Sequence, residues 1–202
     1  EDFKIDILID SGPNARTVRI DLEPFTLVGA TTRLGNISTP MRDRFGAIFR
    51  LDFYQKNEIF KILKRTASIL EMNVRDDALI EIAGRSRGTP RIANRVLKRV
   101  RDFAQVKNVK EIKLEDARSS LDSIGIDENG LENMDRKILK NLIVNYNGGP
   151  TGGKSLAISI NEDIQTIEDV YEPYLIKEGF IERTSRGRIA TDKAYALFNF
   201  KK

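Results

Sequence analysis

The sequence predicts a chain that is α/β at its start and all-α through most of the remainder, with a small helix-and-hairpin unit at its end. Three observations support this fold class. Residues 3–30 contain alternating or continuously apolar runs, which are typical of strands. From Gln55 onward, apolar residues recur at helical spacing. Strand-like alternation returns only near residues 180–191, around an arginine-rich turn.

The composition excludes several classes of protein. The 202 residues include no His, no Cys and no Trp, which rules out zinc fingers, Cys-His or Ser-His nucleophile pairs and disulfide frameworks. The balance of 34 basic and 30 acidic residues gives a net charge of +4. Because the sequence has neither a membrane-length apolar run nor a signal pattern, we expect a cytoplasmic protein without membrane contact. The chain begins with Glu1 rather than Met, and we expect it to be a piece of a longer protein.

The N-terminal segment predicts strands. Residues 3–22 alternate on both sides of turn-forming residues 10–14, which indicates a β-hairpin. Phe25–Ala30 is continuously apolar, as in a strand buried on both faces of a parallel sheet. Thr31 and Thr32 follow it, where such a sheet presents polar groups to ligands.

Residues 55–123 predict a unit of four helices. Ile59, Ile62, Leu63 and Ile69-Leu70 form the apolar stripe of the first helix. Ala78–Ala83 marks a second, Thr89-Pro90 opens a third as N-cap and first-turn proline, and a fourth starts after Lys113.

Arg91 falls in the first turn of the third of these helices, where the helix dipole disfavours positive charge. That misfit indicates a phosphate held at the helix end, and a solvated arginine is the alternative.

The last seventy residues have the element order of a winged-helix domain. Helices are predicted around Met134–Ile143, at Leu156–Ile160 and from Ile164 to Lys177, with Gly179 after the last. A hairpin at 180–191 completes the order. Its turn gathers Arg183, Arg186 and Arg188, which suit a DNA groove or phosphate backbone; solvated charge is the alternative.

Residues 148–155 match the phosphate-loop pattern G-x-x-x-x-G-K-[ST] letter for letter. A phosphate loop needs a buried strand before it and a helix after it. The preceding residues, 135–147, have helical spacing instead, so we interpret the motif as a glycine-rich turn between two helices.

Arg42-Asp43-Arg44 follows a proline turn and precedes Phe45-Gly46. An arginine projecting there can reach a neighbouring subunit's nucleotide and stabilise charge on a transferring phosphoryl group. A surface ion pair with Asp43 is the alternative.

Several segments together closely resemble the RuvB family of AAA+ ATPases, the motors of Holliday-junction branch migration. The resemblance covers essentially the whole chain. The segments that carry it are Phe25–Arg33, Met41–Gly46, Arg87–Arg95, Glu172–Leu175, Gly179–Phe180 and Arg183–Arg188.

The resemblance implies the late part of a RecA-like AAA+ core at 1–54, a helical lid at 55–125 and a winged-helix DNA-binding domain at 126–202. The family's phosphate loop and its Asp-Glu metal and water site precede the region that matches Glu1. The resemblance therefore implies ATP or ADP with Mg²⁺ as cofactors, metal ligands outside this chain, and no ATP hydrolysis by these 202 residues alone. No residue of the chain is assigned as a metal ligand.

The resemblance also assigns nucleotide-facing roles. Thr31 and Thr32 occupy the sensor-1 position near the γ-phosphate and the attacking water. Arg44 matches the trans-acting arginine finger, with Arg42 as the alternative. Tyr54 matches a nucleotide contact at the core–lid junction, and Arg91 matches the sensor-2 arginine.

The remaining assignments concern partners. Arg183 and Arg188 match DNA-contacting positions of the wing, with Arg186 beside them. The hairpin at 3–22 matches the docking element for RuvA, through Ile5, Ile7, Ile9 and Ile20. Exposed apolar hairpin residues are otherwise an aggregation hazard, so a partner would explain them.

The function implied is that of an ATP-dependent DNA translocase. It would act as a homohexameric ring with RuvA on four-way junctions and duplex DNA, in recombination and repair. Two alternatives stay open: a non-enzymatic winged-helix DNA-binding protein, and another AAA+ winged-helix protein such as a replication initiator or clamp loader.

Overall fold

The computed structural model describes residues 3–9 and 16–200. It divides into two compact units, Glu1–Arg50 and Leu51–Lys202, and each is described by itself. No helix in the described part of the chain is long and apolar enough to cross a membrane.

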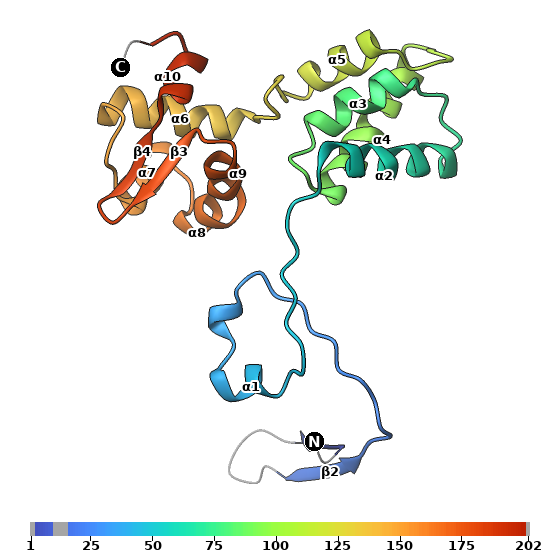
Figure 1. Cartoon of the computed structure of the whole chain (residues 1–202), viewed down its shortest axis with the longest axis vertical. Helices are drawn as coiled ribbons and strands as arrows, with labels where there is room; N and C mark the ends of the chain where they lie inside the picture. Colours follow the sequence, from blue (N-terminus) through green and yellow to red (C-terminus); the bar gives the residue numbers. More distant parts are fainter. Residues whose placement is uncertain (1–2, 10–15, 201–202) are drawn as a thin grey trace. The chain divides into compact units, whose positions relative to one another are not determined.

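The N-terminal unit starts with the hairpin that the alternation predicts. Strands β1 (Lys4–Leu8) and β2 (Thr17–Asp21) pair antiparallel, with Ile5 opposite Ile20 and Ile7 opposite Val18 (Figure 1). The predicted turn at residues 10–14 lies outside the described residues.

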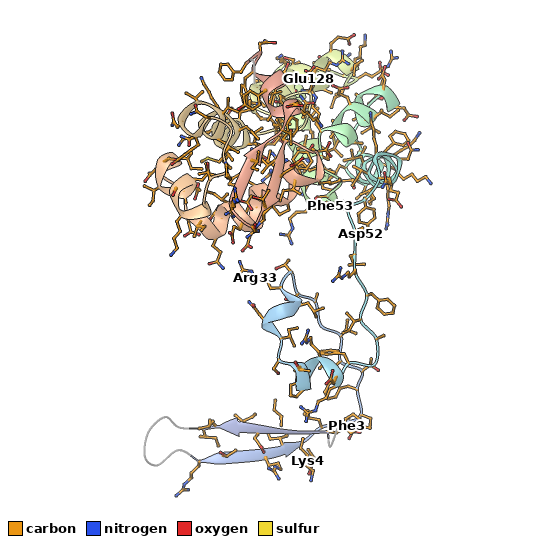
Figure 2. The ribbon with its side chains drawn as sticks, turned by 60° about the vertical axis from the view of Figure 1, so that its left-hand side comes forward. Phe3, Lys4, Arg33, Asp52, Phe53 and Glu128 are labelled. Carbon is orange, nitrogen blue, oxygen red and sulfur yellow. The ribbon has the colours of Figure 1, made fainter. Side chains whose placement is uncertain are left out.

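The predicted buried strand at Phe25–Ala30 is wrong. These residues form no strand and are exposed, with Val28 at 86%. A parallel strand needs neighbouring strands to accept its backbone hydrogen bonds, and no other described residue of this unit supplies one. The 3₁₀ turn η1 (Leu34–Asn36) and helix α1 (Thr39–Asp43) follow. None of the described residues of the unit is buried, and Figure 2 shows its side chains spread along the ribbon.

Four helices begin the second unit, as predicted: α2 (Lys56–Ile69), α3 (Asp76–Gly84), α4 (Pro90–Val106) and α5 (Leu114–Ser123). Helix α2 starts with a capping box, in which Gln55 N–H donates to Glu58 at 2.7 Å. Helix α4 begins at Pro90 after Thr89, as the sequence predicts. Their apolar stripes meet in one core built from Ile59, Leu63, Ile82, Val96 and Leu121 among others. Ile69, predicted as part of the first stripe, is exposed at the end of its helix.

The rest of the unit has its own core, around Leu139, Leu142, Leu156, Leu175 and Phe180. Its elements are α6 (Asn133–Tyr146), α7 (Gly153–Ile160), α8 (Ile164–Thr166), the π-helical segment η2 (Ile167–Tyr171), α9 (Glu172–Lys177), β3 (Ile181–Thr184), β4 (Gly187–Ala190) and α10 (Asp192–Leu197). This order of helices and hairpin confirms the winged-helix architecture (Figure 1).

Two details differ from the sequence prediction. The single helix expected from Ile164 to Lys177 widens into a π turn just before Pro173, whose missing N–H interrupts regular helical bonding. Helix α10 was not predicted; Thr191 caps it by accepting a hydrogen bond from Ala194 N–H at 3.4 Å.

Candidate functional site

The arginine-rich hairpin is formed by β3 and β4, in an antiparallel register that sets Arg183 opposite Arg188. Residues two apart on a strand share a face. Arg183 and Arg188 therefore lie on the face that carries Ile181 and Ala190, both of which are buried in the core. The register thus turns two of the three arginines toward the body of the domain.

Arg188 is buried, with 6% of its surface exposed. Its Nε donates to Glu172, and another guanidinium nitrogen donates to Glu168 at 2.6 Å. Burial lowers the pKa of Arg188, but these two carboxylates outweigh it and hold the pKa above its usual value. The side chain is therefore a permanently charged, internally paired group, which the structure does not bring to the surface.

Arg183 and Arg186 are the exposed members of the cluster. The Arg183 side chain is 54% exposed and lies 3.3 Å from Glu168 and 3.6 Å from Glu172, a pairing that water and salt weaken. Arg186 sits in the turn, where its backbone N–H donates to Thr184 Oγ1 at 3.3 Å. Among the described residues, none pairs with the Arg186 guanidinium. These two arginines present the accessible positive charge of the wing.

The glycine-rich motif at 148–155 follows α6 and runs into the first turn of α7, so a helix rather than a strand enters it, and the interpretation as a turn between two helices is confirmed. Thr151 exchanges two backbone hydrogen bonds with Arg188 of β4, at 2.9 and 3.0 Å. A Cβ on Gly153 would lie 2.5 Å from the Arg188 guanidinium. The glycines therefore serve close packing of this turn against the wing.

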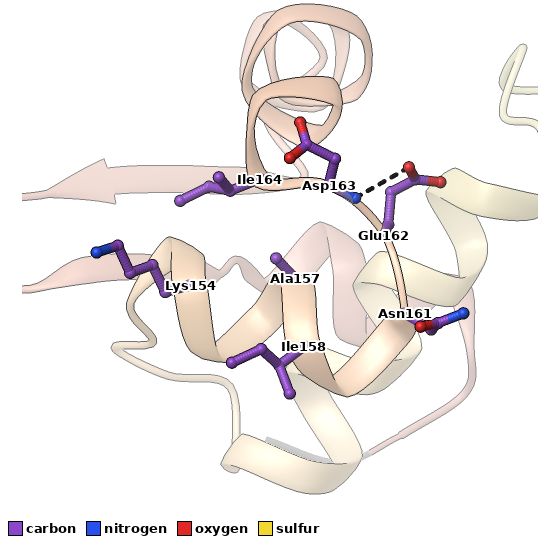
Figure 3. A pocket seen from close by; sticks show the side chains of 7 residues that line it. All are labelled: Lys154, Ala157, Ile158, Asn161, Glu162, Asp163 and Ile164. Atoms are coloured by element: carbon purple, nitrogen blue, oxygen red, sulfur yellow. Dashed lines mark hydrogen bonds between the residues drawn. The ribbon is translucent and has the colours of Figure 1, made fainter.

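Lys154, the lysine of that motif, lines an open surface hollow of about 570 Å³ beside α7. Figure 3 shows Ala157, Ile158 and Ile164 around the hollow, with Glu162 and Asp163 beyond the far end of the helix. Asp163 N–H donates to Glu162 at 3.0 Å. The two carboxylates and the three apolar side chains make this hollow unsuited to a triphosphate.

The N-terminal hairpin carries two chemically distinct faces. Ile5, Ile7 and Ile20 share one face, and each is more than 40% exposed. The opposite face pairs Asp6 with Arg19 at 2.8 Å. Ile9, the fourth predicted docking residue, is 65% exposed just beyond β1. The structure thus brings together the apolar residues that the sequence singled out and leaves them uncovered.

The residues expected to face a nucleotide in the N-terminal unit are all accessible or nearly so. Thr31 and Thr32 are exposed, and Thr31 Oγ1 accepts a hydrogen bond from Arg33 N–H at 3.0 Å. Arg44 is exposed directly after α1, and no described residue pairs with its guanidinium. Arg42 is half-buried and donates to Thr39 at 3.0 Å. Within the described residues, neither arginine forms the alternative ion pair with Asp43.

In the second unit, Tyr54 and the segment that leads to Arg91 lie together. Tyr54 N–H donates to Gly88 O at 2.9 Å, and a Cβ on Gly88 would lie 2.7 Å from Tyr54 O. Gly88 has φ of +67°, a conformation that favours glycine. Arg91 follows in the first turn of α4, is exposed, and has no partner among the described residues. The N-terminus of α4 receives no side-chain cap from Thr89.

No role for Arg85 or Arg87 was predicted from the sequence, although both are buried beside Gly88. Charged residues are almost never fully buried unless they are paired, so such positions point to a specific contact. Arg85 pairs locally with Glu81, four residues earlier in the chain, which was a signal the sequence contained. Its second carboxylate, Asp122, and the partner of Arg87, Asp135, lie 37 and 48 residues further along the chain, so no local pattern marks them.

The described residues offer groups suited to phosphate but no cluster suited to a metal ion. The described residues contain no cluster of three or more His, Cys, Asp or Glu side chains that could hold an ion. Exposed Arg44 and Arg91 fit the anionic part of a nucleotide.

Comparison with protein families accounts for nearly the whole chain. Residues 1–51 match the "Holliday junction DNA helicase RuvB P-loop domain", residues 54–127 the "RuvB AAA lid domain", and residues 128–199 the "RuvB C-terminal winged helix domain".

Individual relatives agree. The Holliday junction branch migration complex subunit RuvB of Oleidesulfovibrio alaskensis is 57% identical over 98% of this chain and 62% of its own length. That of Fusobacterium nucleatum is 52% identical over 98% and 60%. The chain thus spans about 60% of the length of these relatives.

Solved structures show the same fold. The Thermotoga maritima RuvB Holliday junction branch migration motor is 48% identical, with a TM-score of 0.85 over 90% of this chain and 61% of its own. A mutant of that protein gives a TM-score of 0.87 at 46% identity, over 100% of this chain and 64% of its own. With nearly all of its length matched by RuvB domains, the chain belongs to the RuvB family.

Proposed function

We propose that the chain is the sensing, transmitting and DNA-binding part of an ATP-driven motor that moves Holliday junctions together with RuvA in the cytoplasm. The observation that carries the proposal is the 52–57% identity, over nearly the whole chain, to proteins named as RuvB subunits of a branch migration complex.

Residues with nucleotide-facing roles are proposed in each of the two units. Tyr54 lies at the start of the helical lid and Arg91 in the first turn of α4, and the backbone hydrogen bond from Tyr54 to Gly88 brings these two segments together. Arg44 projects without a partner among the described residues, as an arginine that serves a neighbouring subunit of a homohexameric ring must do. Thr31 and Thr32 offer hydroxyl groups for the γ-phosphate and water. ATP would supply the phosphoryl group, and Mg²⁺ would supply positive charge that neutralises the phosphates. The ligands of the metal would lie outside the described residues.

The wing would hold DNA through Arg183 and Arg186. Both guanidiniums are exposed and free to exchange weak surface pairing for phosphate oxygens. Arg188 serves differently in this proposal, because its paired and buried guanidinium fixes the hairpin on Glu168 and Glu172. This division refines the sequence-based assignment, in which all three contact DNA.

The N-terminal hairpin would dock RuvA. Its apolar face has nothing to cover it in the described part of its own unit, and a partner's apolar surface would remove Ile5, Ile7 and Ile20 from water.

The DNA-binding part is tested with this chain itself. Arg183→Glu with Arg186→Glu should weaken binding to four-way and duplex DNA and lower the slope of log affinity against log salt by about 0.9 for each phosphate that the wing no longer neutralises. Titration at several salt concentrations measures both quantities. A control with two charge reversals on the lid, Lys98→Glu with Arg99→Glu, makes the same change in net charge on exposed residues. An equal decrease of affinity in both double variants would contradict a role for the wing.

A further inference from the structure

The segment Arg85–Gly88, between α3 and α4, buries charge to an unusual degree. Arg85, Ser86 and Arg87 are 6%, 0% and 7% exposed. Burying an ionised side chain is costly unless it is paired and hydrogen-bonded. Each arginine must therefore have a specific partner, and the two arginines have different ones.

The hydrogen bonds of the Arg85 side chain lie within the lid. Its guanidinium donates to Glu81 at 2.7 Å, to Asp122 at 3.0 Å and to the carbonyl of Ile126 at 3.1 Å. Burial raises the pKa of Glu81, but the guanidiniums of Arg85 and Arg118 outweigh it and hold that pKa below its usual value. These contacts stay among α3, α5 and the end of the lid core.

Arg87 reaches out of the lid into the winged-helix domain. Its Nε donates to Gly130 O at 2.9 Å, and a second nitrogen donates to Asp135 of α6. Its guanidinium also lies 4.7 Å from the centre of the Tyr174 ring. Arg87 adopts φ of +57°, a left-handed conformation uncommon for a residue with a side chain. Carboxylate, carbonyl and aromatic ring thus surround one guanidinium.

The partners of Arg87 are themselves fixed. Asp135 is fully buried, and its Oδ2 also accepts a hydrogen bond from Glu132 N–H at 2.7 Å. The Tyr174 hydroxyl donates to Asn129 O at 2.7 Å, and burial raises the pKa of Tyr174 to about 12, so the hydroxyl keeps its proton. A Cβ on Gly130 would lie 2.8 Å from the Tyr174 oxygen and 3.1 Å from Arg85 O. The joint between α5 and α6 (Figure 1) is therefore packed around Arg87 with little room to move.

The same segment contacts Tyr54, one of the residues expected to face the nucleotide. Gly88 O binds Tyr54 N–H, and Lys177, at the end of α9, lies 4.5 Å from the centre of the ring of Phe53. Arg91 follows Gly88 by three residues on α4. One short stretch of chain thus joins the start of the lid, the helix that carries Arg91, and the DNA-binding domain.

We infer that Arg87 is a positioning residue that locks the lid and the winged-helix domain into one rigid body. Displacement of the lid at Tyr54 and Arg91 is then carried undiminished to the wing. The consequence for translocation rests on the proposed function, whereas the lock itself does not.

The lock is tested in this chain without nucleotide or DNA. Because the chain has no cysteine, Lys61→Cys on α2 with Ile158→Cys on α7 gives one spin-label pair across the joint, at two exposed positions. Pulsed electron paramagnetic resonance should give one narrow distance distribution. Arg87→Met with Asp135→Leu replaces the pair by apolar groups, which preserves folding, and should broaden the distribution at least about twofold.

Two further variants keep the test decisive. Arg87→Lys retains the charge opposite Asp135 but loses the fork that also reaches Gly130, and it should give intermediate broadening. Arg95→Gln removes an exposed ion pair between the lid and the start of α6, from Arg95 to Glu132 at 3.1 Å, and should leave the distribution unchanged. A distribution that stays narrow in both Arg87 variants would overturn the inference.

The consequence is tested in the full-length protein. The Arg87→Met/Asp135→Leu protein should still hydrolyse ATP and bind DNA, yet migrate at least about tenfold fewer junctions per ATP hydrolysed. Unchanged coupling beside a broadened distance would overturn the positioning role. If the unsubstituted full-length protein moved no junction, the proposed function would fail, while the distance measurement would still decide the lock.

Discussion

The two hairpins of this chain are close in size and opposite in construction. The N-terminal hairpin pairs strands of five residues, every one of them exposed, and its ion pairs, such as Asp6 with Arg19, lie at the surface. The wing pairs strands of four residues, has Ile181, Arg188 and Ala190 buried, and is held from below by two carboxylates.

The difference shows which hairpin can stand without a partner. An isolated two-stranded hairpin is marginally stable in water, and a packed face is what makes it persist. The wing has that face within its own domain. The N-terminal hairpin has an apolar face with no cover in the described part of its unit, which is the arrangement expected where another protein binds.

Removing Glu172, the carboxylate that anchors Arg188 of the wing, should have the largest effect on stability. Glu172→Ala leaves Arg188 buried without its closest carboxylate, and we expect a decrease of about 3–5 kcal/mol in the free energy of unfolding. Urea unfolding followed by tyrosine fluorescence measures it well, because Tyr146, Tyr171, Tyr174 and Tyr195 all lie in the winged-helix domain. Glu182→Ala, on an exposed residue of β3, is the matched control and should change stability by less than about 0.5 kcal/mol. A decrease below about 1 kcal/mol for Glu172→Ala would mean that the pair does not anchor the hairpin.

Substitution of Gly153, which leaves room for the Arg188 guanidinium, should have the second largest effect on stability. Gly153→Ala places a Cβ 2.5 Å from a guanidinium that its carboxylates hold in place, and should cost about 1–3 kcal/mol through overpacking. Gly152→Ala meets no atom closer than 4.0 Å and should cost less than about 1 kcal/mol, as a weaker N-cap. The same urea titration compares them, and equal destabilisation would remove the packing explanation for this glycine-rich turn.

Substitutions in the N-terminal hairpin should have the smallest effect on the free energy of unfolding and the largest effect on partner binding. Ile7→Asp changes an exposed residue and should alter the unfolding free energy by less than about 0.5 kcal/mol, yet it should abolish capture of purified RuvA. Leu8→Asp makes a comparable change on the neighbouring residue, which faces the other side of the strand, and should retain capture. Loss of RuvA capture by both variants, or by neither, would contradict docking by the apolar face. Retained DNA binding with no RuvA binding by the unsubstituted chain would favour the other winged-helix alternatives.

Elements that depend on nearby residues were predictable from the sequence. Helix α4 was located by Pro90 and by its stripe through Val96 and Val100, since both signals are local. The strand predicted at Phe25–Ala30 does not form, because a parallel strand exists only with neighbours that the local sequence does not show.

The candidate site residues likewise divide into those whose environment could be predicted from nearby sequence and those whose environment could not. Exposure of Arg44, Arg91 and Arg186 agrees with what their positions in turns and helix ends suggested. Arg188 was predicted to contact DNA but is buried. Strand alternation places it on the same face as Ala190, so the sequence did contain a signal for its burial. Arg87 carried no signal at all, since its left-handed backbone and its partner Asp135 arise only in the folded chain.

The central claim is that these residues serve a branch-migration motor, and the most direct test is ATP-dependent movement of a synthetic four-way junction by the full-length protein with RuvA. The unsubstituted protein should convert the junction to duplex products only when ATP and Mg²⁺ are present. Arg44→Ala should bind ATP normally but lose both turnover and product. Product formation without ATP, or wild-type turnover by Arg44→Ala, would contradict the account.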